Sequence, residues 1–353
     1  MLHSTRRLLT EDLHPVERSA LIGIVATRGG PADAEALSPR LLGDAAPQWD
    51  VLDAVVRCGG RVMAERLHAR FVADGRLIKD ADPQLLWAFG WAGLEHARSM
   101  LFHYAREREW DHEAPERDWE MAPAAIDGLV HLSPAGLEDE VRAAVEPCVG
   151  RSVFPEHLPA LAGWIGDVDL VDRFLVRDHT SPSTDCMGGV LLAVGLLGPA
   201  GRRRLHELFW TDQYPMIWND APRETGVALR MTGLGVADLI AELRSRIATV
   251  EGMLPFWWFV IVRCMVAHEI AARDAPPRWR FLPAPESLLD LHRALAGPNG
   301  AWDEGINHHA FHRLGPDGEW LAGELHDLER PLEQLIRRDA LIAELCGPGG
   351  GGV

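Results

Sequence analysis

Lysine is almost absent from this chain of 353 residues, because Lys79 is the only lysine among 35 basic residues. A lysine that forms a Schiff base needs a desolvated amine. Lys79 instead lies in the polar segment GRLIKDADP, which argues against Schiff-base chemistry. The arginines that make up the remainder suit bidentate contacts, although coding bias explains their excess equally well.

Cysteine is scarce and unpaired in the sequence. The five cysteines are odd in number, lie far apart and form no C-x-x-C pair: Cys58, Cys148, Cys186, Cys264 and Cys346. This pattern excludes a disulfide framework and favours buried thiols in a reducing compartment.

Long apolar runs are missing as well. The longest run, residues 256–262, is too short to span a bilayer before Arg263. At the N-terminus, Arg6 and Arg7 could open an export signal, but acidic residues precede the short apolar run at residues 20–26. We therefore expect a cytoplasmic protein with no membrane partner.

Two further absences restrict the chemistry. The sequence contains neither a glycine-rich loop that cradles phosphate nor a nucleophile elbow. Its net charge is -17 and its pI is about 5.4. Because nucleic-acid affinity depends on local positive charge, this balance disfavours a nucleic-acid partner and leaves only a local basic patch as a route to one.

What the chain does contain is a repeated helical phrase, which is clearest in GVLLAVGLLGPAGRRRLHELF at residues 189–209. Apolar residues at helical spacing predict one helix, with Gly195 and Gly198 bracketing the expected break. Pro199 suits the first turn of a second helix. The phrase therefore predicts a helical hairpin, which we term a module.

The same phrase recurs along the chain at a nearly fixed step. The anchors of successive modules are Gly60, Gly93, Ser133, Gly166, Gly198 and Gly233. They are separated by 33, 40, 33, 32 and 35 residues. A period of this size is typical of stacked helical-repeat arrays.

The core of the phrase, close to A-x-x-x-G-x-x-G before a leucine-spaced helix, resembles the HEAT-like repeats of the phycobilisome-lyase type over roughly residues 47 to 247. The resemblance implies an all-α, right-handed α-solenoid of about six or seven helical hairpins with atypical caps. Members of this repeat class include scaffolds, lyases, DNA glycosylases and a metal-dependent hydroxylase, so the resemblance alone assigns no activity.

We expect four parts along the chain. Residues 1–46 form an N-terminal capping region, with a helix at about 15–27 followed by a loop. Residues 47–252 form the HEAT-like repeat array and residues 253–345 a C-terminal helical cap. The glycine-rich residues 346–353 form a disordered tail.

Helix starts are marked by a capping side chain beside a proline. This pattern occurs at Asp82-Pro83 and Ser133-Pro134, and again at Asp220 before Pro222. It predicts that a helix begins at each of these prolines.

The segments that link one hairpin to the next carry the candidate ligand-binding residues. They read WDHEAPERDW, RDHTSPSTDC and WTDQYPMIWND, and the first two share the spacing D-H-x5-D. The residues singled out are Trp110, Asp111, His112, Trp119, Asp178, His179, Trp210 and Trp218. Since the segments occupy equivalent positions, we expect them to line one rim of the superhelix and to suit a cationic or metal-bound ligand.

Simpler explanations exist for the same residues. An aspartate after a helix commonly bonds backbone groups of the turn. The chain has thirteen tryptophans against two tyrosines, and several tryptophans near the repeat turns, Trp87 and Trp91 among them, could simply fill gaps between helices. Indole faces can equally hold apolar or cationic ligands.

Histidines give one metal-like pattern, in the segment GINHHAFHRLG. If this segment is helical, His308 and His312 share a face at i, i+4, and His309 with His312 is the other pairing. A divalent metal is one explanation of this cluster, and solvated or packed histidines are the other. With no carboxylate partner identified, we predict no cofactor.

The leading functional hypothesis is a binding or scaffold protein that presents a concave groove and an acidic, tryptophan-bearing rim to a peptide, a protein or a basic or apolar small molecule. The rival is a cyclase or lyase whose tryptophans stabilise a developing cation, with Asp185 or Asp220 handling the proton. A DNA glycosylase is a third hypothesis, which the acidic composition disfavours.

Overall fold

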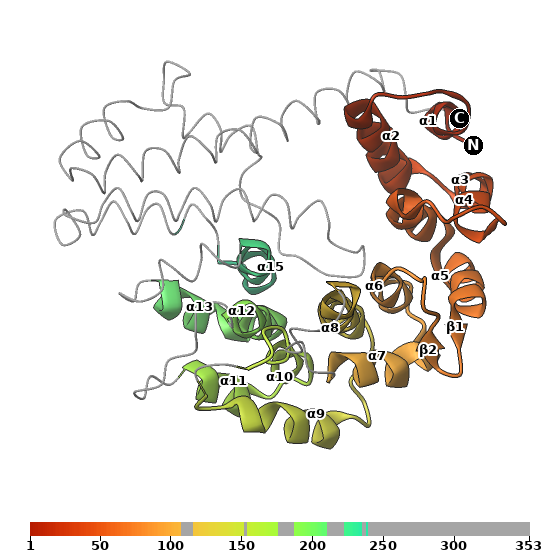
Figure 1. Cartoon of the computed structure of the whole chain (residues 1–353). Coiled ribbons are helices and arrows are strands. Elements are labelled where there is room, and N and C mark those ends of the chain that lie inside the picture. The colour runs from red at the N-terminus through yellow and green to blue at the C-terminus, as the bar shows by residue number, and fades with distance from the viewer. Residues whose placement is uncertain (107–115, 152–153, 176–186, 210–221, 235–237, 239–353) are drawn as a thin grey trace, which may run out of the picture. The chain divides into compact units, whose positions relative to one another are not determined.

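The structure is a computed structural model that describes residues 1–106, 116–151, 154–175, 187–209, 222–234 and 238 (Figure 1). These residues are mostly helical, and one short two-stranded hairpin is their only sheet, which confirms the all-α class. They divide into two compact units, with the boundary between Leu137 and Glu138. Each unit is described by itself.

The first unit begins with four helices, α1 (His3–Thr10), α2 (Pro15–Arg28), α3 (Pro31–Leu37) and α4 (Pro39–Leu42). The helix expected at 15–27 is confirmed as α2. The loop expected after it was wrong, because two prolines open short helices there. Proline is tolerated in a first helical turn, where its missing N–H costs nothing.

Asp33 of α3 ties the first residues of the chain to this cap. Its Oδ1 accepts hydrogen bonds from the Leu2 backbone N–H and the Thr5 hydroxyl, each at 2.6 Å, and its Oδ2 accepts one from the Gly30 N–H at 3.1 Å. Burial by itself raises the pKa of this carboxyl, but the three donors outweigh burial and hold the pKa below its usual value.

The next helix, α5 (Leu52–Phe71), follows a 3-10 turn, η1 (Trp49–Val51). Gly60 interrupts α5 with φ 54 and ψ -143, so that two helical segments meet without a loop. This is the first anchor glycine, and it turns one long helix into the two helices of a module.

Strands β1 (Val72–Ala73) and β2 (Arg76–Leu77) then form a hairpin that the helical pattern did not predict. Its turn is Asp74-Gly75, with both residues at positive φ, which is a known hairpin signal. The Leu77 N–H donates to the hydroxyl of Tyr104 at 3.0 Å and thereby fixes the hairpin to helix α7 (Arg98–Ala105).

The second module holds α6 (Gln84–Trp91), the turn η2 (Glu95–Ala97) and α7 (Arg98–Ala105), and α8 (Glu116–Leu129) opens the third. Helix α6 packs between α5 and α8, and α7 packs on α8. Asp82 Oδ1 accepts the Gln84 N–H at 2.8 Å, so the predicted helix start at Asp82-Pro83 is confirmed.

The predicted helix start at Ser133-Pro134 was wrong. Ser133 Oγ accepts the Ala135 N–H at 3.3 Å, but this closes a turn, and the helix begins four residues later at Glu138. The start at Pro222 is confirmed by α15, while Asp220 lies outside the described residues.

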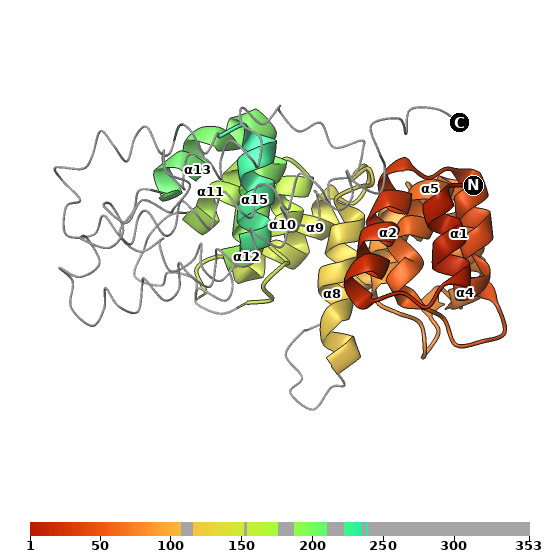
Figure 2. The same cartoon turned by 90° about the horizontal axis from the view of Figure 1, so that it is seen from above.

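The second unit repeats the alternation of first and second helices. It contains α9 (Glu138–Val145), η3 (Glu146–Cys148), α10 (Ala160–Trp164), α11 (Val168–Leu175), α12 (Met187–Leu196), η5 (Gly198–Gly201), α13 (Arg202–Phe209) and α15 (Pro222–Thr232). The first helices of three successive modules lie side by side in chain order, since α10 packs on α12 and α12 on α15 (Figures 1 and 2).

The two glycines of the repeated phrase have different roles. The second glycine takes positive φ at five of the six anchors, at Gly60, Gly93, Gly166, Gly198 and Gly233. Ser133 does not, and Gly136 takes the positive φ of that turn instead. Because left-handed backbone favours glycine, the pattern marks the turn inside each module.

The first glycine also has a packing role. Gly195 and Gly198 bracket the break as predicted, since α12 ends at Leu196 and η5 begins at Gly198, and a Cβ built on Gly195 would stand 2.8 Å from Ala228 Cα of α15. A Cβ on Gly163 would likewise overlap the Ala193 backbone, and one on Gly90 the Gly128 backbone. Glycine here allows two helix backbones to approach closely.

Two of the first helices, α10 and α12, are buried around almost their whole circumference. All nine residues from Met187 to Gly195 of α12 are buried, as are all five residues of α10. The second helices are amphipathic, so that α11 buries Leu170, Val171 and Phe174 and exposes charged residues between them. The first helices therefore carry the core, and the second helices carry the polar surface.

Candidate functional site

The residues that we singled out for ligand binding and catalysis lie outside the described residues. This applies to Trp110, Asp111, His112, Asp178, His179, Asp185, Trp210, Trp218 and Asp220, and to the metal candidates His308, His309 and His312. Trp119 lies on α8, and its side chain is outside the described part. The functional geometry that can be built from the structure comes from other residues.

An aromatic cluster on α5 and α6 is the described arrangement closest to a tryptophan-bearing surface. Trp87 and Trp91 lie one turn apart on α6, with ring centroids 6.0 Å apart and planes at 39°. The guanidinium carbon of Arg57 on α5 lies 6.0 Å from the Trp87 ring and 5.7 Å from the Trp91 ring. A cation at this distance from an indole face is attracted by the ring quadrupole.

The charge of Arg57 is balanced within the same cluster. Its Nε donates to Asp53 Oδ1 at 2.6 Å, one turn earlier on α5. The Arg57 side chain is only 13% exposed, whereas that of Asp53 is 43% exposed. The cluster therefore turns its carboxylate toward solvent, while the Arg57 cation lies over the two indoles, as expected for an indole face that holds a cation.

Trp91 adds a buried donor. It is 9% exposed, and its indole Nε1 has no acceptor among the described residues. A buried N–H without an acceptor costs free energy. The tryptophan spacing on α6 was visible in the sequence, but its pairing with Arg57 depends on the packing of α5 against α6.

Arginines connect successive modules in both units. Arg98 of α7 donates to the Ser133 carbonyl oxygen at 2.9 Å, and Arg202 of α13 donates to the Gly233 carbonyl oxygen at 2.6 Å. In each pair the arginine lies in the second helix of one module and the acceptor is the anchor of the next. Each arginine side chain thus donates a hydrogen bond to the backbone of the turn in the following module.

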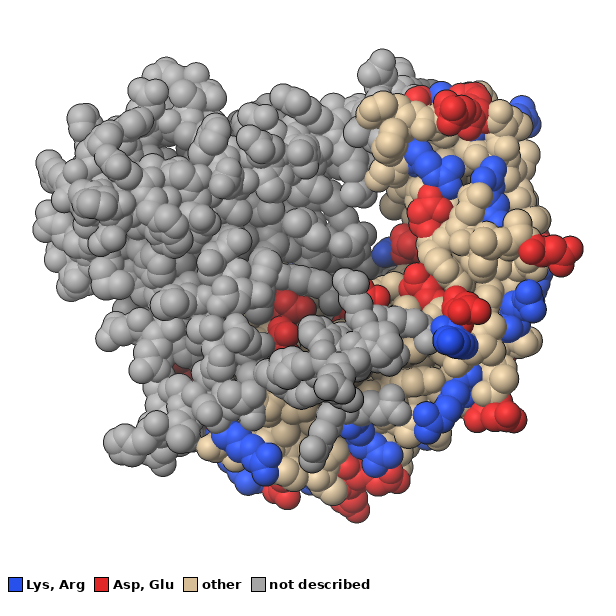
Figure 3. Space-filling view, in the orientation of Figure 1, with Lys and Arg blue, Asp and Glu red and all other residues tan. Residues whose placement is uncertain are grey.

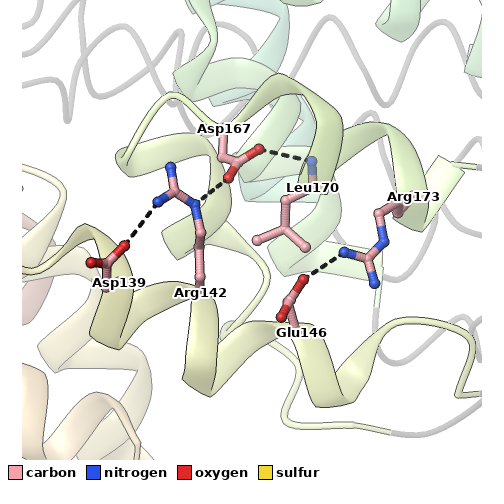
Figure 4. Close-up of polar contacts among 6 residues, drawn as sticks. All are labelled: Asp139, Arg142, Glu146, Asp167, Leu170 and Arg173. Carbon is pink, nitrogen blue, oxygen red and sulfur yellow. Dashed lines mark hydrogen bonds and ion pairs between the residues drawn. The ribbon is translucent and has the colours of Figure 1, made fainter.

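The contact between α9 and α11 shows this connection most fully (Figure 4). Arg142 Nε donates to Asp167 Oδ2 at 2.7 Å, and Asp167 Oδ1 accepts the Leu170 N–H at 3.0 Å and so caps α11. The Arg142 guanidinium, followed by the Leu170 N–H, holds the pKa of Asp167 below its usual value. Arg173 Nη1 donates to Glu146 Oε1 at 2.7 Å across the same pair of helices.

The triple arginine at residues 202–204 is the most basic run in the described sequence, but two of its members are engaged internally. Arg202 pairs with Asp238 at 2.8 Å, and Arg204 binds both carboxylate oxygens of Asp172. The third, Arg203, is 81% exposed and lies 3.5 Å from Glu207. A phosphate backbone would have to compete with these carboxylates for the same guanidinium groups.

Acidic and basic side chains are interspersed over the described surface in Figure 3. Within the described residues, no three His, Cys, Asp or Glu side chains gather as metal ligands do. In the same part of the chain, no helix is both long and apolar enough to cross a bilayer. Cys58 and Cys148 are both buried, as expected for those two cysteines.

Comparison with known proteins adds no relative. No family model matches the chain, and no curated protein or solved structure is significantly similar to it.

Proposed function

We propose that the chain is a HEAT-like helical-repeat protein that acts as a binding scaffold. The observation that carries this proposal is the in-register packing of the first helices α10, α12 and α15, through Gly163 against Ala193 and Gly195 against Ala228. Modules that stack in this way form an α-solenoid, whose long surface is used for binding in other repeat proteins.

Parallel stacking supports a shared rim. Gly189 of α12 lies against residues 156–157, just before α10, and Ala193 of α12 lies against Gly163 of α10, so contact positions advance together. In the next pair, Gly195 of α12 lies against Ala228 and Gly201 of η5 against Thr232, both in α15. Helices α12 and α15 therefore run in the same direction, and their first residues, Met187 and Pro222, lie at the same end.

The proposed ligand is a peptide, a protein or a small molecule that carries cationic or apolar groups. The net charge of -17 favours basic ligands over acidic ones. The cluster of Asp53, Arg57, Trp87 and Trp91 supports the same preference, since a carboxylate and two indoles of the chain hold the cationic group of Arg57. Asp178 and Asp185 are the proposed rim carboxylates.

A displayed library of random peptides tests the proposal. We expect the purified protein to enrich basic and aromatic peptides, and the Asp178→Asn, Asp185→Asn double variant to bind the enriched peptides at least about tenfold less. Asp169→Asn, at an exposed aspartate inside helix α11 and not in a linking segment, is the matched control. If the double variant loses thermal stability and keeps its peptide affinity, these aspartates are structural caps and the proposed rim is wrong.

A further inference from the structure

Two histidine rings meet at the junction between the first and second modules. His68 lies in the part of α5 that follows Gly60, and His96 lies in η2. Their ring centroids are 4.8 Å apart and their planes are at 80°. Phe89 of α6 contacts His68 on another side, with centroids 5.2 Å apart.

The charged groups around this pair are few among the described residues. Glu65, one turn before His68 on α5, places its Oε2 3.5 Å from His96 Nε2. The same glutamate accepts a hydrogen bond from Arg61 at 3.4 Å. Phe89 brings no charge from α6, and Glu35 of α3 pairs with Arg66 of α5.

This arrangement accommodates one proton more easily than two. The His96 side chain is 46% exposed and lies beside the Glu65 carboxylate. Protons on both rings would place two positive charges in contact. His68 is half-buried, and burial followed by the neighbouring His96 lowers its pKa, while Glu65 opposes the shift.

We propose that the His68–His96 contact is a proton-sensitive junction that loosens the packing of α5 on the second module when the pH falls below neutral. The direction of this pH effect follows from the linkage between proton binding and stability. His68 takes up protons more readily in the separated state, so the junction loses stability as pH falls through the ordinary histidine pKa of about 6.5. The loss is complete below the lowered pKa of the packed state.

Histidine Cε1–H NMR of the full chain tests the pair directly. We expect one resonance, assigned by its absence in His68→Gln, to titrate below the usual range, and we expect His96→Gln to shift that titration upward. His157→Gln is the matched control, because His157 lies 3.7 Å from Glu156 with no ring contact to a second histidine among the described residues. A His68 titration that is ordinary, or that ignores His96→Gln, would overturn the proposal.

Hydrogen exchange measures the loosening itself. After correction for intrinsic rates, amides of residues 84–97 should exchange several-fold faster at about pH 5.5 than at about pH 7.5. His96→Gln should reduce this acceleration, whereas His157→Gln should leave it unchanged. Equal acceleration in the wild type and in His96→Gln would show that the histidine pair does not control the junction.

Discussion

The backbone of Gly195 in α12 lies against Ala228 in α15 so closely that a Cβ on Gly195 would stand 2.8 Å from Ala228 Cα. Real side chains do not reach this distance, so Gly195→Ala must push the two helices apart. We expect a loss of about 3 kcal/mol in the free energy of unfolding, at the upper end of overpacking costs. Urea denaturation measures it, and a loss under about 1 kcal/mol would contradict the close packing.

Gly198, three residues later, has the opposite character. It has φ 61, and a Cβ on it would meet no atom within 4 Å. Gly198→Ala should therefore cost only the left-handed backbone strain of about 1–2 kcal/mol. Gly198→Asn should cost less, because asparagine tolerates this conformation. If the asparagine variant is no more stable than the alanine variant, conformation is not what selects glycine there.

Arg204 should not be replaceable by lysine. It binds both oxygens of Asp172, with Nη2 to Oδ2 at 2.6 Å, and its side chain is 18% exposed. Lysine cannot make this bidentate contact, so Arg204→Lys should lower the free energy of unfolding by about 1 kcal/mol. Arg203→Lys, at a side chain that is 81% exposed, is the adjacent control and should change it by less than about 0.5 kcal/mol.

Acid should weaken the fold through Asp167 and Asp172. Hydrogen bonds from Arg142 and Arg204, respectively, hold the pKa of each carboxyl below its usual value. The stability they contribute is present above the unfolded-state pKa of about 3.9 and is lost as pH falls through the lowered folded-state values. The Asp167→Asn, Asp172→Asn variant should therefore show a smaller drop in urea midpoint between about pH 5 and about pH 2 than Asp80→Asn shows.

Cys58 should resist thiol reagents in the native protein. Its Sγ lies 2.9 Å from the Val25 carbonyl oxygen, and burial raises the pKa of the thiol to about 12. The thiolate is the reactive form, so alkylation at neutral pH should follow unfolding of α5 and not precede it. Mass spectrometry of the alkylated peptide, with and without urea, checks this. Rapid native labelling would contradict the burial.

The sequence predicted helices and their turns well because their signals are local. Gly93, Gly166, Gly198 and Gly233 take left-handed backbone at the turns that the repeated phrase predicted. The packing role of Gly195 was not predicted, since a glycine required by a neighbouring helix looks the same in sequence as one that precedes a break in its own helix. The hairpin at Asp74-Gly75 was missed because two-residue strands are too short to show alternation.

The polar contacts could not be predicted from the sequence for a different reason. Arg142 with Asp167, and Arg57 with Trp91, join residues 25 and 34 positions apart, so each depends on how two modules pack. The large number of arginines is typical of bidentate contacts, but it does not indicate which carboxylates accept them. The predicted rim residues lie outside the described part, and their proposed roles stay predictions.

The complete burial of α12 limits where this protein can vary. A helix that touches neighbours on every side offers no position at which a new side chain could point into water, from Met187 to Gly195. Changes of specificity, whether selected in nature or introduced in a combinatorial library, must therefore fall on the outer helices and on the connections between modules. Randomising the exposed positions of α13, such as Arg203 and Glu207, while keeping α12 constant would preserve the architecture and alter only its chemistry.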